Sequence, residues 1–278
     1  MTRAALVLSG GGLLGVGWEL GVLRGLQDGG IEMARFDLVI GTSAGASSGA
    51  IAASGAQLEA ISPVAESDRE IAAMFQQMNP EVMGPVFSAL MSGGEADQSR
   101  RARIGAIARL TQTPEDLYIE VIRGYLPDIP WPRPLVITAV DIDDGAFVSW
   151  PVDAGVSLIR AVAASSALPG IFPPVTIKGR RYMDGATRSP TSADLAAGND
   201  VVVIVAAPSR SEQSDRQIAA ETAEVRAAGG KIVEIRPDLE SGAAFGPDAM
   251  DSSRQGLVFE AGLRQGRAAA GEVAACLG

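Results

Sequence analysis

Short apolar segments alternate with helical segments along this chain, and glycine-rich turns connect the first two pairs. Residues 4–8 form an apolar run, residues 10–12 are all glycine, and residues 13–27 have the periodicity of a helix. The same order returns at 36–40 and 44–54, again with a glycine-containing turn between the two segments. Short apolar strands that alternate with helices are typical of a largely parallel sheet with helices on both faces. The pattern therefore predicts an α/β fold.

The remaining elements follow from the same patterns and from two turn signals. Asp143-Asp144-Gly145 and Lys178-Gly179 each join two short strand patterns, which predicts two hairpins. Strands are expected at 4–8, 36–40, 135–142, 147–150, 175–177, 181–183, 201–206 and 231–235. Helices are expected at 13–27, 44–54, 156–166, 212–228 and 257–275. We expect one domain over residues 1–278, because 47% hydrophobic residues are enough for a sizeable core.

Residues 58–132 interrupt this alternation, because they contain helical patterns but no convincing strand. We expect a helical insertion here that forms a cap on the domain. Met74, Met78, Met83 and Met91 lie within it. These methionines either fill the core of the insertion itself or form an adaptable apolar wall for a flexible acyl chain, since methionine packs against irregular shapes.

Charge and cysteine content argue against several classes of protein. The formal net charge is −10 and the pI is about 4.6, which argues against nucleic-acid binding and against electrostatic docking on anionic lipid. The single cysteine, Cys276, cannot form an intramolecular disulfide, which fits a reducing compartment. No signal-peptide pattern is visible, and the apolar run at 201–207 is too short to cross a bilayer. We therefore expect a cytoplasmic protein.

Four glycines, Gly10, Gly11, Gly12 and Gly15, belong to the segment that links the first strand to the first helix. Their amide N–H groups are expected at a helix N-terminus, where the negative charge of a phosphate or an oxyanion is stabilised. The same residues match the dinucleotide-binding pattern G-x-G-x-x-G, so a nucleotide-binding oxidoreductase is an alternative. That pattern also requires an acidic residue at the end of the second strand, but this strand ends on Gly41-Thr42-Ser43.

The residues Gly41-Thr42-Ser43-Ala44-Gly45 have the G-x-S-x-G spacing of a nucleophile elbow, a sharp turn from a strand into a helix. Gly45-Ala46-Ser47-Ser48-Gly49 has the same spacing, but Ser47 is expected a full turn inside the helix. Ser43 is therefore the candidate nucleophile. The chain contains no histidine, the residue that usually activates such a serine.

An aspartate is the remaining candidate for the base. Asp144-Gly145-Ala146 and Asp184-Gly185-Ala186 are two similar triplets. Turn chemistry explains the first, which lies in a predicted hairpin, whereas Asp184 follows a strand and opens a long loop. Burial in an apolar pocket raises the proton affinity of a carboxylate, so Asp184 can take the proton from the serine. No metal site is apparent in a chain without histidine and with one cysteine.

Together these motifs resemble the patatin-like phospholipase family, in the family's order and over most of the chain. Residues 164–175, ASSALPGIFPPV, are similar to the block that precedes the aspartate in that family. The resemblance implies a three-layer α/β/α fold, a Ser43–Asp184 dyad, and an oxyanion hole that contains the amides of Gly11 and Gly12. It also implies a lipid or other acyl ester as substrate, transient contact with a membrane or micelle, and no cofactor.

One position departs from the family. Leu14 stands where arginine or lysine is usual, so a positive charge near the loop is lost. The change argues against a phosphate-bearing head group more than against an acyl ester, since backbone amides survive it. A non-catalytic acyl-binding protein is a third alternative, which the presence of both Ser43 and Asp184 disfavours. The sequence contains no indication of an oligomeric state.

Overall fold

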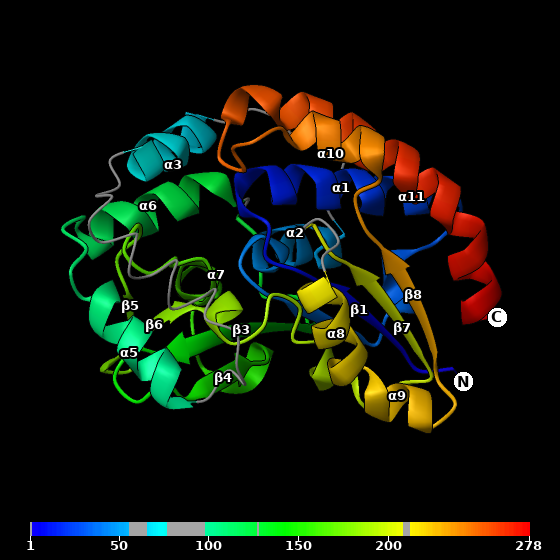
Figure 1. Ribbon diagram of the computed structural model, residues 1–278, viewed down its shortest axis with the longest axis horizontal. Helices are drawn as coiled ribbons and strands as arrows, with labels where there is room; N and C mark the ends of the chain where they lie inside the picture. Colours follow the sequence, from blue (N-terminus) through cyan, green and yellow to red (C-terminus); the bar gives the residue numbers. More distant parts are fainter. Residues whose placement is uncertain (1, 56–65, 77–97, 127, 208–211) are drawn as a thin grey trace.

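An eight-stranded mixed sheet forms the centre of the fold, with helices on both faces (Figure 1). The computed structural model describes residues 2–55, 66–76, 98–126, 128–207 and 212–278. The strands are β1 (Ala4–Leu8), β2 (Leu38–Gly41), β3 (Leu135–Asp141), β4 (Phe147–Trp150), β5 (Val175–Ile177), β6 (Arg180–Asp184), β7 (Val201–Val205) and β8 (Lys231–Ile235). Each predicted strand is found, with its ends shifted by two residues at most.

The sheet has a parallel part and an antiparallel part. Its order is β5-β6-β3-β2-β1-β7-β8, and β4 pairs with β3 beside this path. Strands β3, β2, β1, β7 and β8 are parallel to their neighbours in that series. Strands β4, β5 and β6 pair antiparallel, because the two predicted hairpins bring them into the sheet. The sheet is therefore mixed rather than uniformly parallel.

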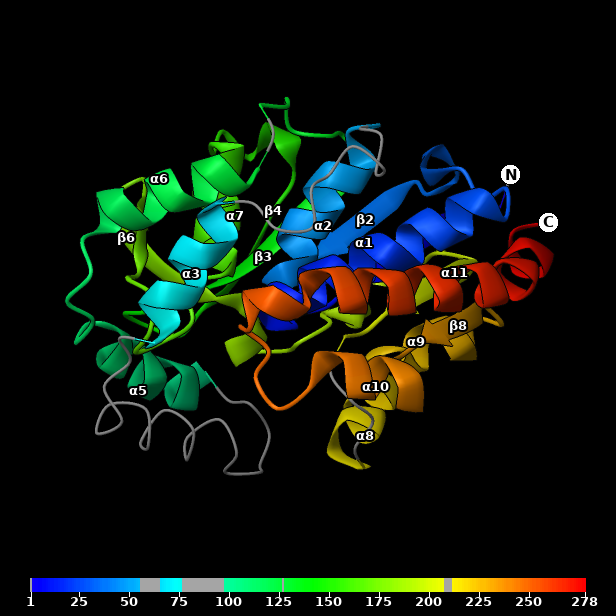
Figure 2. The same cartoon turned by 90° about the horizontal axis from the view of Figure 1, so that it is seen from above.

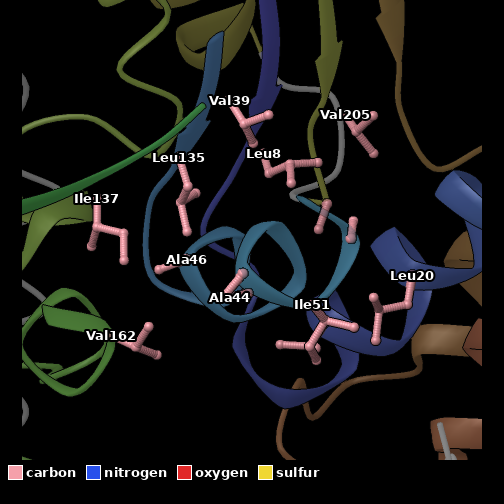
Figure 3. Packing of buried hydrophobic residues seen from close by; sticks show 14 of the residues in the cluster. Leu8, Leu20, Val39, Ala44, Ala46, Ile51, Leu135, Ile137, Val162 and Val205 are labelled. Carbon is pink, nitrogen blue, oxygen red and sulfur yellow. The ribbon is translucent and has the colours of Figure 1, made fainter. Parts of the chain in front are cut away.

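The larger hydrophobic core lies on one face of the sheet, and the helices that contribute to it include α1 (Gly12–Asp28), α2 (Ala44–Ala53), α7 (Leu158–Ser165) and α11 (Gln255–Leu277). Helix α2 lies in the middle of this core. Side chains from three neighbouring strands, Leu8, Val39 and Leu135, point toward it (Figure 3). On the side of α2 away from these strands, its own Ile51 lies near Leu20 of α1 (Figure 3). Every residue of β1 is buried, which explains its continuous apolar run.

Helices α1 and α11 lie side by side in both views (Figures 1 and 2). A Cβ added to Gly21 of α1 would lie 2.2 Å from the carbonyl oxygen of Phe259, and one added to Gly262 would lie 2.2 Å from that of Trp18. Such distances are far below van der Waals contact, so both positions require glycine. This close approach fixes α1, whose N-terminus carries the glycine loop.

Helices α5 (Gln98–Ala108), α8 (Glu212–Glu221) and α9 (Ala223–Ala227) cover the opposite face of the sheet through two smaller hydrophobic clusters. The fold thus has the three α/β/α layers that the family resemblance implies. The predicted helix at 212–228 is two helices, separated at Thr222, whose hydroxyl donates 2.7 Å to the carbonyl oxygen of Ile218. Helix α10 (Leu239–Phe245) was not among the predicted elements.

Within residues 58–132, the structure describes residues 66–76, 98–126 and 128–132, which contain the helices α3 (Glu66–Gln76), α5 and α6 (Glu115–Tyr125). Helix α3 packs on α6, and α6 packs on α7. Helix α5 packs against the other face of β3, so these helices do not all lie in one layer. A cap over the domain remains a proposal.

The four methionines of this region are only partly covered by the structure. Met74 is half-buried and packs against the larger core, whereas Met78, Met83 and Met91 lie outside the described residues. None of the helices described is both long enough and apolar enough to span a membrane.

Candidate active site

The candidate residues gather at one edge of the sheet, where the parallel strands end. The glycine loop follows β1, Ser43 follows β2, and Asp184 is the last residue of β6. Strand β3 lies between β2 and β6, and its residue Ala139 pairs with Asp184. The carboxyl ends of parallel strands are the usual place for a ligand in an open α/β sheet.

Ser43 occupies a tight turn with φ 54° and ψ −116°, one of three non-glycine residues with positive φ among those described. The turn has no room for side chains on either flank. A Cβ on Gly41 would lie 2.5 Å from the carbonyl oxygen of Gly45, and one on Gly45 would lie 2.1 Å from that of Leu8. The amide N–H of Ser43 donates a 2.9 Å hydrogen bond to Ser165 Oγ. Strained backbone of this kind is common where a reactive side chain must be presented.

Asp184 is buried and faces this serine directly. Its Oδ2 accepts a 2.8 Å hydrogen bond from Ser43 Oγ, and its Oδ1 accepts one of 2.8 Å from the amide of Ala186. The amide of Asp184 donates a 3.0 Å hydrogen bond to the carbonyl oxygen of Ala167. A Cβ on Gly185 would lie 2.5 Å from Thr138 Oγ1, so the residue after the aspartate must be small. The carboxyl group is therefore held at both oxygens.

Burial determines the protonation of Asp184. Removal from water disfavours the charged carboxylate and raises the pKa of Asp184 to about 7, against the opposing effect of its hydrogen bonds from Ala186 and Ser43. A base with a pKa near neutrality can both accept a proton and return it at ordinary pH. The pair Ser43–Asp184 therefore has the geometry and the proton affinity of a nucleophile with its base.

The amides of the glycine loop divide into two groups. The amide of Gly10 donates a 2.8 Å hydrogen bond to the carbonyl oxygen of Pro190, and the amide of Gly15 donates one of 3.0 Å to the carbonyl oxygen of Gly11. The amides of Gly11 and Gly12 have no acceptor among the described residues, and both glycines line the same pocket as Ser43. Gly10 and Gly15 therefore support the loop, while Gly11 and Gly12 are available as donors to a ligand.

Two close contacts explain why this loop needs its glycines. Gly12 has φ +66°, a conformation that L side chains rarely adopt, and a Cβ on Gly11 would lie 2.5 Å from Ala207 Cβ. Leu14, at the position where the family usually has a basic residue, is completely buried in the larger core. The departure from the family therefore places an apolar side chain in the interior behind the loop.

A pocket of about 290 Å³ contains Ser43, Asp184 and the loop glycines. Its apolar lining includes Leu13, Val16, Ile71, Ile122, Leu168 and Met250. Tyr118 of α6 and Phe172 extend this lining and stack with ring centroids 5.0 Å apart. No lysine or arginine is among the described residues that line the pocket. An uncharged, apolar group therefore fits the space beside the serine.

The two alternative residues have other environments. Ser47 also lines the pocket, but it lies within α2, and of these two serines only Ser43 forms a described hydrogen bond with Asp184. Asp144 lies in the turn between β3 and β4 and forms a 2.6 Å ion pair with Arg180 at the surface. The structure brings Asp184, and not Asp144, to Ser43.

Sequence reasoning missed three contributors to this site. Ser165 binds the amide of Ser43, and Tyr118 and Phe172 form a wall of the pocket. Ser165 and Phe172 belong to the 164–175 block, so the resemblance included these residues but did not predict a role for either one. Tyr118 lies on a helix of the 58–132 region, where no motif pointed to it.

Comparisons with known proteins identify the family of this chain. A sequence model described as patatin-like phospholipase matches residues 6–197. Among solved structures, the chain is similar to VipD from Legionella pneumophila, with a TM-score of 0.48 and 15% sequence identity, over 98% of this chain and 67% of that one. No curated protein sequence matches significantly.

Proposed function

Because this chain belongs to the patatin-like phospholipase family, we propose that it is a serine acyl hydrolase that cleaves carboxylic esters of lipids with Ser43 and Asp184. The family supports a lipid acyl hydrolase in general. The assignment of the nucleophile, the base and the oxyanion donors is our proposal. We prefer the hydrolase to a dinucleotide-binding oxidoreductase, because the second strand leads into Ser43 rather than into the acidic residue that dinucleotide binding requires.

One observation carries the proposal: Ser43 Oγ donates a 2.8 Å hydrogen bond to a buried carboxylate in an apolar pocket. The chain has no histidine, so an imidazole base is excluded. Burial raises the pKa of Asp184 to about 7 and so gives this carboxylate a proton affinity close to that of an ordinary histidine.

In the proposed reaction, the carboxylate of Asp184 takes the proton of Ser43 as Oγ attacks the carbonyl carbon of the ester. The oxyanion that forms accepts hydrogen bonds from the amides of Gly11 and Gly12, which are positioned by the loop and by the start of α1. The C–O bond to the alcohol breaks, and Asp184 returns the proton to the leaving oxygen. A water molecule then repeats these steps on the acyl-enzyme, which releases the carboxylic acid and restores Ser43.

The lining of the pocket supports an acyl chain as the group bound beside Ser43. Most of the described side chains around it are apolar, and the stacked pair Tyr118–Phe172 forms part of the wall. Leu14 removes the basic residue that is usual in the family, which favours neutral esters over phosphate-bearing lipids. Transient contact with a micelle or membrane, as part of substrate uptake, belongs to the same proposal.

A fluorophosphonate probe tests this function directly, because it reacts with activated serines beside an oxyanion hole. We expect a single adduct on Ser43, found by intact mass and peptide mapping, and a labelling rate that falls strongly in Asp184→Asn. No adduct on the wild type would favour a non-catalytic acyl-binding protein. An adduct on Ser47 would instead move the nucleophile to the second motif, and equal labelling of both proteins would remove Asp184 as the base.

A further inference from the structure

The carboxyl group of Glu19 lies entirely inside the protein, and the proposed reaction does not use it. Glu19 is on α1, one helical turn after Gly15, and is 0% exposed. No basic side chain of the described residues forms an ion pair with it. Burial of an ionisable group is unfavourable unless hydrogen bonds compensate for the lost water. Burial also raises the pKa of Glu19 well above its usual range.

One end of this carboxyl group holds the start of the glycine loop. Glu19 Oε1 accepts a 3.0 Å hydrogen bond from the amide of Ser9, the residue between β1 and Gly10. The hydroxyl of Ser9 lies 3.4 Å from the same oxygen, and it also contacts the carbonyl oxygen of Gly10 at 3.0 Å. Ser9 Oγ also accepts a 2.9 Å hydrogen bond from the amide of Ala207, and Gly11 packs on the side chain of Ala207. Glu19 therefore fixes the residue from which the loop begins.

The other end of the group holds the helix that carries the nucleophile. Glu19 Oε2 accepts a 2.5 Å hydrogen bond from Ser48 Oγ. Ser48 is fully buried on α2, the helix that begins directly after Ser43. A second link joins the same two segments, since the amide of Gly45 donates 2.8 Å to the carbonyl oxygen of Ser9.

We propose that Glu19 is a positioning residue that sets the distance between the amides of Gly11 and Gly12 and the oxygen of Ser43. Its two carboxyl oxygens bind the two segments that must act on one carbonyl group. The inference rests on the proposed hydrolase function. Donors must lie about 3 Å from the developing oxyanion, and a displacement of about 1 Å costs roughly 100-fold in rate. A leucine of similar size would fill the space but would leave Ser9 and Ser48 without this partner.

The test compares Glu19→Leu with Glu19→Gln, which keeps the shape and can still bind both serines. Hydrolysis of a p-nitrophenyl ester is measured per active site, with sites counted by fluorophosphonate labelling. We expect kcat to fall roughly 10- to 100-fold in Glu19→Leu with little change in KM, and Glu19→Gln to remain within roughly 3-fold of the wild type. Leu23→Ala is the control, because Leu23 is buried on the same helix one turn further along and its apolar side chain forms no hydrogen bond with either segment. It should lower Tm but keep kcat per active site.

Ser48→Ala cuts the link on α2 without altering α1, so it keeps the proposal testable if Glu19→Leu does not fold. We expect it to lower kcat in the same way, and its effect to add little to that of Glu19→Leu, because both changes break one connection. Wild-type kcat per active site in Glu19→Leu, or in a folded Ser48→Ala, would overturn the positioning role alone. A wild type that neither hydrolyses esters nor takes up the probe would overturn the hydrolase function and this inference together.

Discussion

Ser43 Oγ donates a 2.8 Å hydrogen bond to Asp184 Oδ2, although the two residues are 141 positions apart in the chain. Strand β3 brings them together. Thr138 Oγ1 of this strand lies 2.7 Å from the hydroxyl oxygen of Thr42, the residue before Ser43. The same oxygen would lie 2.5 Å from a Cβ added to Gly185, the residue after Asp184. One buried threonine therefore contacts the neighbours of both residues, so the geometry of the pair depends on how closely β2 and β6 pack on β3.

The first prediction concerns the pair itself. Ser43→Ala and Asp184→Asn should each lower kcat/KM for an acyl ester by at least roughly 1000-fold, because each removes a group that acts only in the reaction. Asp144→Asn is the matched control, since this aspartate precedes the same Gly-Ala sequence but pairs with Arg180 at the surface. It should stay within roughly 2-fold of the wild type. Ester assays, with circular dichroism as a check on folding, decide the matter, and the opposite ranking of the two aspartates would refute the assignment.

The second prediction is a pH profile. Asp184 can act as a base only when it is ionised, and burial raises its pKa to about 7. The rate should therefore be low at pH 5, rise through about pH 7, and level off above pH 8. The initial rate of hydrolysis of a neutral ester between pH 5 and pH 9 measures this. A profile that is already flat at pH 5 would show that the carboxylate is not the group that titrates.

The third prediction links the same ionisation to stability. Folded Asp184 keeps its proton up to about pH 7, whereas an aspartate in an unfolded chain loses it near pH 4. Between these values the folded protein binds more protons, so the free energy of unfolding contributed by this group falls as pH rises. Asp184→Asn should match the wild type near pH 4 and be more stable at pH 8, by up to about 4 kcal/mol.

Urea unfolding of both proteins at pH 4 and pH 8 gives the comparison. Burial also raises the pKa of Glu19, which therefore acts in the same direction in both proteins and cancels from their difference. Equal pH dependence in the wild type and Asp184→Asn would mean that Asp184 ionises alike in the folded and unfolded states.

The fourth prediction separates the oxyanion role of the loop from backbone strain. Gly12→Ala should lower kcat roughly 100-fold, because the new side chain both strains a residue at φ +66° and lies 3.1 Å from the carbonyl oxygen of Ala249, which displaces the loop amides. Gly30→Ala is the control. Gly30 has φ +86° with nothing within 4 Å, so the change adds similar strain away from the site.

Activity per folded molecule and Tm are measured for both glycine variants. We expect both to lose stability and only Gly12→Ala to lose activity. Equal loss of activity in the two would attribute the effect to strain rather than to the position of the donors.

The fifth prediction concerns chain length. Phe172→Ala should remove the stacking partner of Tyr118 and enlarge the pocket, which shifts preference toward longer acyl chains. Tyr118→Phe keeps the ring and removes only the 3.2 Å hydrogen bond to the carbonyl oxygen of Ala163, so it should keep the wild-type preference. A series of p-nitrophenyl esters from acetate to laurate measures kcat/KM for each. An unchanged profile in folded Phe172→Ala would place the acyl chain elsewhere.

Local patterns were sufficient to predict the strands, the elbow and the glycine loop, because each depends on neighbours in the chain. A strand that is buried on both faces must be apolar along its length, and the turn at Ser43 leaves no room beyond hydrogen at Gly41 and Gly45. Asp184 could be preferred over Asp144 for the same kind of reason, since a hairpin turn explained only the second. A structural feature can be predicted from the sequence when the residues that determine it lie within a few positions of one another.

Only the tertiary structure decided which distant groups meet. The contact of Ser43 with Asp184, the bond from Ser43 to Ser165, and the bridge from Glu19 to Ser9 and Ser48 join segments that no local pattern relates. Glu19 looked like an ordinary helical residue in the sequence, yet the packing of α1 between α2 and α11 removes it from water. The sequence thus specifies the elements through periodicity and turn chemistry, whereas the environment of each polar group, and hence its chemistry, depends on which elements pack around it.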